Sequence, residues 1–319
     1  LTLTLCLSDI SALKIGAFNI RAFGDSKMKN PEVSSVLMKI LPRYDIVIIQ
    51  EVRDADHSAV KLLMQRLNRF VWADPFTMQS QLEGQRNLRL DKLCLNVCRN
   101  KTPPETFAFL DLWPHSLNTG PVYSHVISDT LGRDAYKEQY LFIYRNDKVT
   151  VEDSYHYHDH CMYTGKDTFS REPFVVRFNA EGTVVEDFVL IPLHSAPKDA
   201  VREIDALYDV YEDIMEKWQT DNMIFLGDFN AGCSYVTDSD WDNIRLRTNE
   251  QFAWLIPDAT DTTVGNTCCA YDRIVVSGAD LQEAIVQDSV KVFDFQKKYK
   301  LTQEEALAVS DHFPVEMEL

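Results

Sequence analysis

Runs of hydrophobic residues alternate with polar stretches along the chain and predict a succession of strands and helices. Residues 13–20 predict a strand, and residues 45–51 are apolar almost throughout, which is typical of a strand buried on both faces. A short helix is expected over residues 31–41, where a proline stands at the first turn. A second helix is expected after residue 51, ending near Asn68.

The clearest helix in the pattern covers residues 198–219. Ile204, Leu207, Tyr211 and Ile214 recur there at helical spacing. Strands are expected at residues 136–145, 148–157, 173–180, 187–195, 222–230, 271–278 and 312–319. Many strands, few long helices and no linker between them indicate one layered α/β domain over residues 13–319.

Residues 70–121 follow neither period. This stretch mixes Arg, Gln, Asn, Thr and Pro with scattered Leu, and it contains the chain's one N-x-S/T acceptor site, at Asn100. A structureless segment of this length is unusual inside a compact domain. We therefore expect an insertion at about 70–121 that loops out of the fold. It can be a lineage-specific loop or a retained non-coding segment, and the absence of periodicity favours the second.

Composition narrows the class of protein. The 319 residues include 49 acidic and 32 basic side chains, for a formal charge of −17, and 45% of residues are hydrophobic. This mixture is typical of a globular protein. No apolar run approaches the ~20 residues of a membrane span, which excludes an integral membrane protein. The acidic balance argues against a protein that coats nucleic acid by bulk positive charge.

The seven cysteines and the first residues bear on the compartment. No cysteine pair has CxxC spacing, and Cys94 and Cys98 are not followed by further paired zinc ligands, so a zinc site is not favoured. Residues 1–12 form a short apolar stretch that ends in small residues. They are interpreted as the remnant of a secretory signal peptide, with an ordinary N-terminal strand as the alternative.

Polar side chains stand at the ends of the predicted strands, and they carry the candidate chemistry. They are Asn19, Glu51, His194, Asp228, Asn230, Asp272, Asp311 and His312. Strand ends are where α/β folds assemble sites. Oxygen ligands of this kind suit Mg²⁺ or Ca²⁺ rather than zinc, and two histidines beside carboxylates suit general acid–base catalysis.

These residues lie in stretches that resemble the deoxyribonuclease I family, within the endonuclease/exonuclease/phosphatase superfamily. The matching stretches include KIGAFNIRAFGDSK, DIVIIQEVRD, YKEQYLF, SREPFVVRF, GDFNAGCSYV, CAYDRIVV and SDHFPVE, and together they cover residues 13–69 and 122–319. The resemblance implies a four-layer α/β/β/α sandwich of two packed, mainly antiparallel sheets flanked by helices. It also implies a secreted, divalent-cation-dependent endonuclease that cuts double-stranded DNA with little sequence specificity and leaves 5′-phosphates.

The family pattern assigns roles to the matching residues. His194 and His312 would be the acid–base pair, with Glu138 and Asp272 orienting one imidazole each. The divalent ion and the scissile phosphate would be held by Glu51, Asn19, Asp228, Asn230 and Asp311. Mg²⁺ and Ca²⁺ are the expected ions, with Mn²⁺ as a substitute.

Further assignments follow from the same resemblance. DNA contacts are implied for Arg21, Arg53, Arg133, Tyr136 and Arg171. One structural calcium site is implied for Asp159, Asp167, Phe169 and Glu172. A second is implied for Asp261, Thr263 and Thr267, although Gly265 lacks the side-chain oxygen usual at its position. Cys233 and Cys269 match the family's main disulfide, with Cys268 as an extra neighbour.

Three alternatives are weighed against this interpretation. Residues 156–160 spell HxHxDH, the dizinc motif of metallo-β-lactamase-type hydrolases, but further downstream ligands are lacking. A binding protein that has lost catalysis is a second alternative, since deoxyribonuclease I binds monomeric actin. Most of the matching actin-contact positions are changed, so we expect weak or absent actin binding and a monomer. Another superfamily phosphodiesterase is the third.

Overall fold

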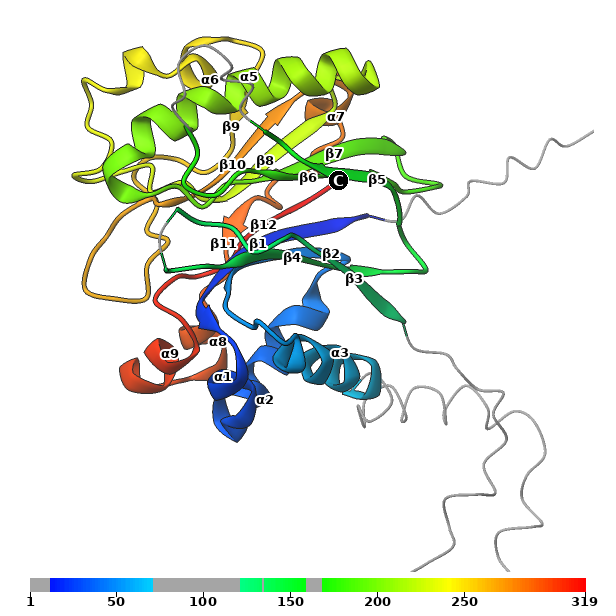
Figure 1. The fold of residues 1–319 in the computed structure, drawn as a ribbon, viewed down its shortest axis with the longest axis vertical. Coiled ribbons are helices and arrows are strands. Elements are labelled where there is room, and N and C mark those ends of the chain that lie inside the picture. The colour runs from blue at the N-terminus through cyan, green and yellow to red at the C-terminus, as the bar shows by residue number, and fades with distance from the viewer. Residues whose placement is uncertain (1–11, 71–120, 134, 159–167) are drawn as a thin grey trace, which may run out of the picture.

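Two six-stranded sheets lie face to face in the computed structural model, which describes residues 12–70, 121–133, 135–158 and 168–319 (Figure 1). Helices cover the outer face of each sheet. The expected α/β/β/α sandwich is therefore confirmed. Among the described strands, β1 runs parallel to β2 and β7 runs parallel to β8, while the remaining neighbours are antiparallel.

The first sheet has the strand order β11-β12-β1-β2-β4-β3. Its strands are β1 (Lys14–Phe23), β2 (Ile46–Val52), β3 (Tyr123–Ile127), β4 (Gln139–Arg145), β11 (Lys291–Val292) and β12 (Val315–Glu318). The second sheet has the order β5-β6-β7-β8-β10-β9. Its strands are β5 (Thr150–His156), β6 (Phe174–Asn179), β7 (Asp187–Pro192), β8 (Met223–Asp228), β9 (Ala253–Trp254) and β10 (Asp272–Ser277).

Helices pack on the outer side of both sheets. Those beside the first sheet are α1 (Asp25–Lys29), α2 (Pro31–Ile40), α3 (Ser58–Phe70), α8 (Phe295–Tyr299) and α9 (Gln303–Val309). Those on the side of the second sheet are α5 (Ala200–Trp218), α6 (Arg245–Thr248) and α7 (Ala279–Glu283). None of the helices in the described part of the chain is long and apolar enough to cross a membrane.

The central strands are apolar on both faces because each face meets a different layer. Val47 and Ile49 of β2 pack under the helices, whereas Ile46 and Ile48 face the second sheet. This is the period of two that an extended chain imposes. It explains why the sequence of β2 reads as a continuous apolar run rather than as an alternating one.

The inward-facing rows change from apolar to polar at one end of the sandwich. In β1 the row that contains Ile15 and Ala17 continues to Asn19, and in β2 the row that contains Ile46 and Ile48 continues to Gln50. The second sheet repeats the change, since the inward row of β8 ends on Asp228 and that of β10 begins on Asp272. Four buried polar side chains thus meet between the sheets at one end of the core.

Several elements differ from the sequence-based expectations. Strand β3 was not predicted, because only part of its short polar-apolar run is buried and its position depends on pairing with β4. Strands β9 and β11 have two residues each and carry no readable period. The first strand continues past Asn19 to Phe23, through a register shift in its pairing with β2.

Candidate active site

Two histidines lie at the polar end of the core, and each is hydrogen-bonded to its own carboxylate. His194 follows β7, and its Nδ1 lies 2.5 Å from Glu138 Oε1. His312 lies between α9 and β12, and its Nδ1 lies 2.7 Å from Asp272 Oδ2. Both carboxylates are buried. Such a partner fixes the tautomer of the imidazole and leaves Nε2 free to face the site.

Both free Nε2 atoms point to the same carboxylate. Asp228 Oδ2 lies 3.6 Å from His194 Nε2 and 3.5 Å from His312 Nε2. Asp228 and Asp272 are direct cross-strand partners on β8 and β10. Like charges in that arrangement repel each other. The two imidazoles compensate this repulsion, and they bring four titratable groups together.

The carboxylates raise the affinity of both imidazoles for a proton. Burial lowers the pKa of His312, but Asp272 and Asp228 outweigh it and raise the pKa to about 10. Burial also opposes the charged form of His194, and Glu138 and Asp228 again raise its pKa above the ordinary value. In turn, the pKa of Asp228 is lowered, because the charges of His312 and His194 overcome its burial.

Glu51 joins this cluster from the first sheet through a strained turn. Its φ of 57° and the φ of 51° at Ala22 are unusual for residues with a side chain, and both occur where the β1–β2 pairing shifts. Glu51 Oε2 accepts hydrogen bonds from Ala22 N at 2.9 Å and from the Tyr136 hydroxyl at 3.0 Å. Burial raises the pKa of Glu51, but His194 and these donors lower it overall.

Asn19 links the carboxylates of the two sheets. Its Nδ2 donates to Glu51 Oε1 at 3.2 Å and to Asp228 Oδ2 at 3.1 Å. Its Oδ1 is buried and has no hydrogen-bond partner among the described residues, and Asp311 Oδ1 is in the same state. Asn230, in left-handed backbone conformation, donates from its backbone N–H to Asp228 Oδ1 at 3.0 Å. The unpaired Oδ1 of Asn19, whose amide nitrogen bonds to Glu51, fits a hard cation.

A different trio also meets the geometric requirement for a metal. Ligand atoms of Asp228, Asp272 and His312 lie within 4.8 Å of one another. However, His312 Nδ1 is occupied by Asp272, and a pKa of about 10 keeps this imidazole protonated at neutral pH. A protonated imidazole has no lone pair for a metal. The oxygen ligands around Glu51 are therefore the better cation site.

Three buried residues that sequence reasoning missed hold the site in place. The hydroxyl of Tyr140 accepts a hydrogen bond from His194 N at 2.9 Å, and the Ser310 hydroxyl donates to Asn19 O at 2.6 Å. Gln50 bonds to the backbone of the second sheet. The signal for Gln50 was a polar residue on the inward row of an otherwise apolar strand.

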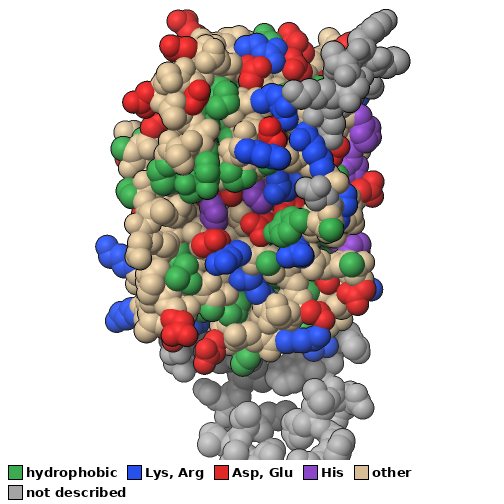
Figure 2. Space-filling view, turned by 60° about the vertical axis from the view of Figure 1, so that its left-hand side comes forward, with side chains coloured by type: hydrophobic (Ala, Val, Ile, Leu, Met, Phe, Trp, Pro, Cys, Tyr) green, Lys and Arg blue, Asp and Glu red, His purple; other side chains and the backbone are tan. Residues whose placement is uncertain are grey.

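Tyr136, Arg21 and Arg171, three of the residues expected to contact DNA, each contact an acidic residue of the candidate site. Tyr136 is 43% exposed, and the guanidinium of Arg53 stacks 4.2 Å from the centre of its ring. Arg21 is also exposed, with its Nε 3.6 Å from Asp311 Oδ2. On the face drawn in Figure 2, histidine and acidic side chains lie recessed, and Lys and Arg side chains surround them.

Arg133 and Arg171 are held by the protein itself. Arg133 Nη2 donates to Phe169 O at 2.9 Å. Arg171 has a side chain only 12% exposed, and its Nε lies 2.5 Å from Glu138 Oε1 while its Nη1 donates to His194 O at 2.8 Å. Arg171 therefore supports the His194–Glu138 pair directly.

The calcium-site predictions fall partly on undescribed residues. Asp159 and Asp167 lie outside the described residues, whereas the carbonyl of the buried Phe169 accepts from Arg133. At the second loop the Thr263 hydroxyl donates to Asp261 Oδ1 or to Thr267 O, at 2.8 and 2.6 Å. That loop thus folds its oxygen atoms toward one another.

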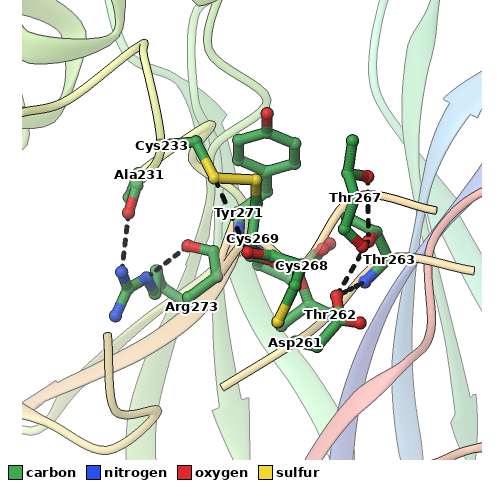
Figure 3. The surroundings of a disulfide bond; sticks show 12 residues. Ala231, Cys233, Asp261, Thr262, Thr263, Thr267, Cys268, Cys269, Tyr271 and Arg273 are labelled. Atoms are coloured by element: carbon green, nitrogen blue, oxygen red, sulfur yellow. Dashed lines mark hydrogen bonds between the residues drawn. A yellow bond between two sulfur atoms is a disulfide. The ribbon is translucent and has the colours of Figure 1, made fainter. Parts of the chain in front are cut away.

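The predicted disulfide joins Cys233 to Cys269, beside this second loop (Figure 3). Cys268 is exposed, and its thiol is free. Cys6, Cys94, Cys98 and Cys161 lie outside the described residues.

The HxHxDH stretch is occupied by structural contacts where it is described. His156 Nε2 accepts a hydrogen bond from Asp129 N at 3.0 Å, and its ring stacks on Phe174 at 4.7 Å. Asp159 and His160 lie outside the described residues. A nitrogen that accepts a backbone hydrogen bond is not available to a metal, which disfavours the dizinc alternative.

Comparisons with known proteins agree with this geometry. The sequence profile of the Endonuclease/Exonuclease/phosphatase family matches residues 16–312. Deoxyribonuclease-1 of Rattus norvegicus is 49% identical over 319 residues, covering 100% of this chain and 95% of the relative. Deoxyribonuclease-1-like 2 of Mus musculus is 48% identical over 307 residues, covering 96% and 91%.

Solved structures share the fold at low identity. A family member from Leptotrichia buccalis superposes with a TM-score of 0.56 at 14% identity, covering 96% of this chain and 98% of that one. A second, from Bacteroides vulgatus, gives 0.53 at 16% identity, covering 97% and 98%. With near-half identity to deoxyribonucleases along its whole length, this chain belongs to the deoxyribonuclease I family of the endonuclease/exonuclease/phosphatase superfamily.

Proposed function

We propose that this protein is a divalent-cation-dependent endonuclease that hydrolyses phosphodiester bonds of double-stranded DNA and leaves 5′-phosphate ends. The observation that carries the proposal is the convergence of His194 Nε2 and His312 Nε2 on Asp228, each imidazole being backed by a second carboxylate. A phosphodiester needs one group that takes a proton from water and one that gives a proton to the leaving oxygen.

The two histidines would divide this work. His312, with a pKa of about 10, carries a proton at neutral pH and is suited to protonate the leaving 3′ oxygen. His194 would accept the proton of the attacking water through Nε2, while Glu138 stabilises the imidazolium that results. Water attack on phosphorus with departure of the 3′ oxygen gives the 5′-phosphate and 3′-hydroxyl products.

Glu51 would be the principal metal ligand, together with the unpaired Oδ1 of Asn19 and with Asp228, Asn230 and Asp311 nearby. A bound Mg²⁺, or Mn²⁺ in its place, would neutralise charge on the phosphate and lower the pKa of the attacking water. Ca²⁺ would stabilise the loops that carry Phe169 and Glu172, and Asp261, Thr263 and Thr267. The thermal midpoint of unfolding should then rise with added Ca²⁺ and fall after chelation.

DNA would be contacted in the minor groove and along the phosphates. Tyr136 with its stacked Arg53 forms an exposed aromatic–guanidinium pair that is bonded to Glu51, and Arg21 lies beside Asp311. Arg side chains suit a narrow minor groove and bidentate phosphate contacts. Arg133 and Arg171 would contribute less directly, because both are already engaged by protein groups.

Secretion, a monomeric state and weak or absent actin binding complete the proposal. Secretion is what the family resemblance implies. The positions expected to contact actin read Asp56, Gln65, His125, Ile127, Asp129 and Phe174. Nicking that stays constant as actin is titrated would agree with this. Strong inhibition by actin would contradict it.

The decisive experiment measures nicking of supercoiled plasmid with Mg²⁺ and Ca²⁺. His194→Ala and His312→Ala should each lower the rate by about 10²–10⁴-fold, since each removes a proton-transfer group. His125→Ala is the matched control, because His125 is exposed on β3 and should leave the rate unchanged. If both site variants nick as fast as the parent, the mechanism is wrong. If Zn²⁺ alone restores activity after chelation, the dizinc alternative gains support.

A further inference from the structure

Gln50 is a fully buried amide that connects the two sheets beside the active site. It lies on β2 with its side chain on the inward row. Its Nε2 donates to Leu193 O at 2.7 Å, and its Oε1 accepts from Asp228 N at 2.8 Å. Leu193 follows β7 and Asp228 ends β8, so both partners belong to the second sheet. The donor and the acceptor of one side chain thus bind two neighbouring segments of the opposite layer.

One of these bonds ends on the backbone of a site residue, Asp228, and the other on the residue directly before His194. Leu193 directly precedes His194, and the Asp228 N–H belongs to the carboxylate that both imidazoles face. Glu51 directly follows Gln50 in the sequence. One amide therefore ties together the segments that carry the proposed base, the shared carboxylate and the principal metal ligand.

The opposite sheet is shaped to receive this side chain. Gly227 has a φ of +129°, and a Cβ at this position would lie 2.3 Å from Gln50 Nε2 and 2.6 Å from Leu193 O. Any residue other than glycine would push the amide away from its partners. The amide of Gln50 therefore packs directly against the backbone of β8, with no room for a side chain between the two sheets at this point.

We propose that Gln50 is a positioning residue for phosphodiester cleavage, because its amide sets the separation between Glu51 in one sheet and His194 and Asp228 in the other. The proposal rests on the site assigned under the proposed function. Gln50 does not touch the reacting atoms. Its loss would let the two halves of the site shift, and a misplacement of about 1 Å can cost about 10²-fold in rate.

The test compares Gln50→Met with Asn68→Leu. Methionine keeps the length of Gln50 but removes both hydrogen bonds. Asn68 is a matched control, because its amide also makes two backbone bonds, to Tyr123 O at 3.1 Å and from Tyr123 N at 2.8 Å, away from the site. We expect similar losses in thermal midpoint for the two variants. Plasmid-nicking kcat should fall about 100-fold for Gln50→Met, with KM within about threefold, and stay within about twofold for Asn68→Leu.

Rates are normalised to the folded fraction measured by circular dichroism. A Gln50→Met protein whose normalised kcat stays within about threefold of the parent, or whose KM alone changes, overturns the proposal. If this variant does not fold, Gln50→Glu decides the same question, since it keeps the acceptor for Asp228 N and places an oxygen against Leu193 O. His194→Ala is measured alongside. If His194→Ala remains active, the site assignment fails. If His194→Ala loses activity while the Gln50 variants keep full activity, only the positioning role of Gln50 is refuted.

Discussion

Arg171 distinguishes two histidines that otherwise have the same kind of partner. Glu138 serves both His194 and Arg171, since Arg171 Nε and His194 Nδ1 each lie 2.5 Å from Glu138 Oε1. The charge of Arg171 opposes the protonated form of His194. The charges that act most strongly on His312 are those of Asp272, Asp228 and Asp311, which all favour its protonated form and raise its pKa to about 10. When the surroundings of two titratable groups give them different pKa values, one can act as the acid and the other as the base at the same pH.

The first prediction concerns Asp272. Replacing it by Asn removes the main charge that raises the pKa of His312, so this pKa should fall from about 10 toward its ordinary value. The protonated form of His312 is then lost at lower pH, and the alkaline limb of the kcat profile should move down in pH. At neutral pH we expect kcat to fall about 10²–10⁴-fold. Plasmid nicking measured from about pH 6 to beyond the parent's His312 pKa of about 10 checks both effects.

Asp153→Asn is the control for Asp272→Asn, because Asp153 is an exposed carboxylate on β5. It should leave both the rate and the shape of the profile unchanged. An Asp272→Asn profile that merely scales down, with its alkaline limb in place, would show that Asp272 does not set the pKa of His312.

At the scale of elements, a buried ionic cluster fastens β12 to the start of the fold. Glu316 is fully buried on β12, and its carboxylate meets Lys14 Nζ at 3.0 Å, Arg43 Nη2 at 2.9 Å and the Tyr44 hydroxyl at 2.9 Å. The ring of Tyr44 packs over Gly16, where a Cβ would lie 2.7 Å from it. The cluster therefore joins β12, β1 and the turn before β2.

The second prediction follows from the charge of Glu316. Burial raises its pKa, but Lys14, Arg43 and Tyr44 lower it overall. A depressed pKa stabilises the fold above the ordinary glutamate value of 4.5, and this stabilisation is lost as the pH falls through the folded-state pKa. Glu316→Gln removes the buried carboxylate that pairs with Arg43 and one of the two that pair with Lys14, which keeps Glu318, and should lower the free energy of unfolding by about 3–5 kcal/mol at neutral pH.

Urea unfolding at a series of pH values checks this prediction. The difference between parent and Glu316→Gln should shrink as the pH falls below 4.5. Glu304→Gln, an exposed acid in the first turn of α9, is the control and should change stability little at any pH. A Glu316→Gln difference that is constant with pH would contradict the role of the charge.

Elements that carry their own hydrophobic pattern were predictable from the sequence, and elements that depend on a partner strand were not. The strand at 45–51 and the helix at 198–219 carry their own pattern, and the structure has them at Ile46–Val52 and Ala200–Trp218. Strand β3 is positioned by pairing with β4, which no local pattern records. The polar strand ends were predictable as a site. That Gln50 spans the sheets was not, since its partners are more than 140 residues away, at separations of 143 and 178.

At the scale of the whole molecule, the charge of −17 and a DNA substrate are compatible. Several of the carboxylates lie inside the site or in ion pairs. The exposed cation Arg21 lies beside Asp311, and Arg53 stacks on Tyr136, the partner of Glu51. A small local positive region on an acidic protein favours weak binding with little sequence readout. Because few phosphates are contacted, the affinity of such binding should fall with salt concentration less steeply than that of a protein with many phosphate contacts.

The third prediction concerns the expected insertion at about 70–121. Asn68 and Tyr123 are joined by two hydrogen bonds. The chain therefore leaves the folded domain and re-enters it at nearly the same point. Replacing residues 70–121 by a short Gly-Ser connection should therefore keep the paired strands β3 and β4 in register. We expect the shortened protein to nick plasmid at least as fast as the parent, with a thermal midpoint that is no lower.

A folded but inactive deletion variant would contradict this prediction. It would show that the segment contributes to the site or to the loop that carries Arg133 and Tyr136. The control keeps the same connection but adds His312→Ala, which must be inactive for the nicking to come from this site.

Strand β12 lies between β11 and β1, and Leu13 and Leu319 exchange backbone hydrogen bonds across this closure. His312, just before β12, is synthesised after all the other residues of the proposed site. A growing chain on the ribosome can therefore build the second sheet, with His194 and Asp228, while it still lacks one of its two imidazoles. Until β12 is made and closes the first sheet, the nascent chain therefore lacks His312, one of the two groups proposed for proton transfer.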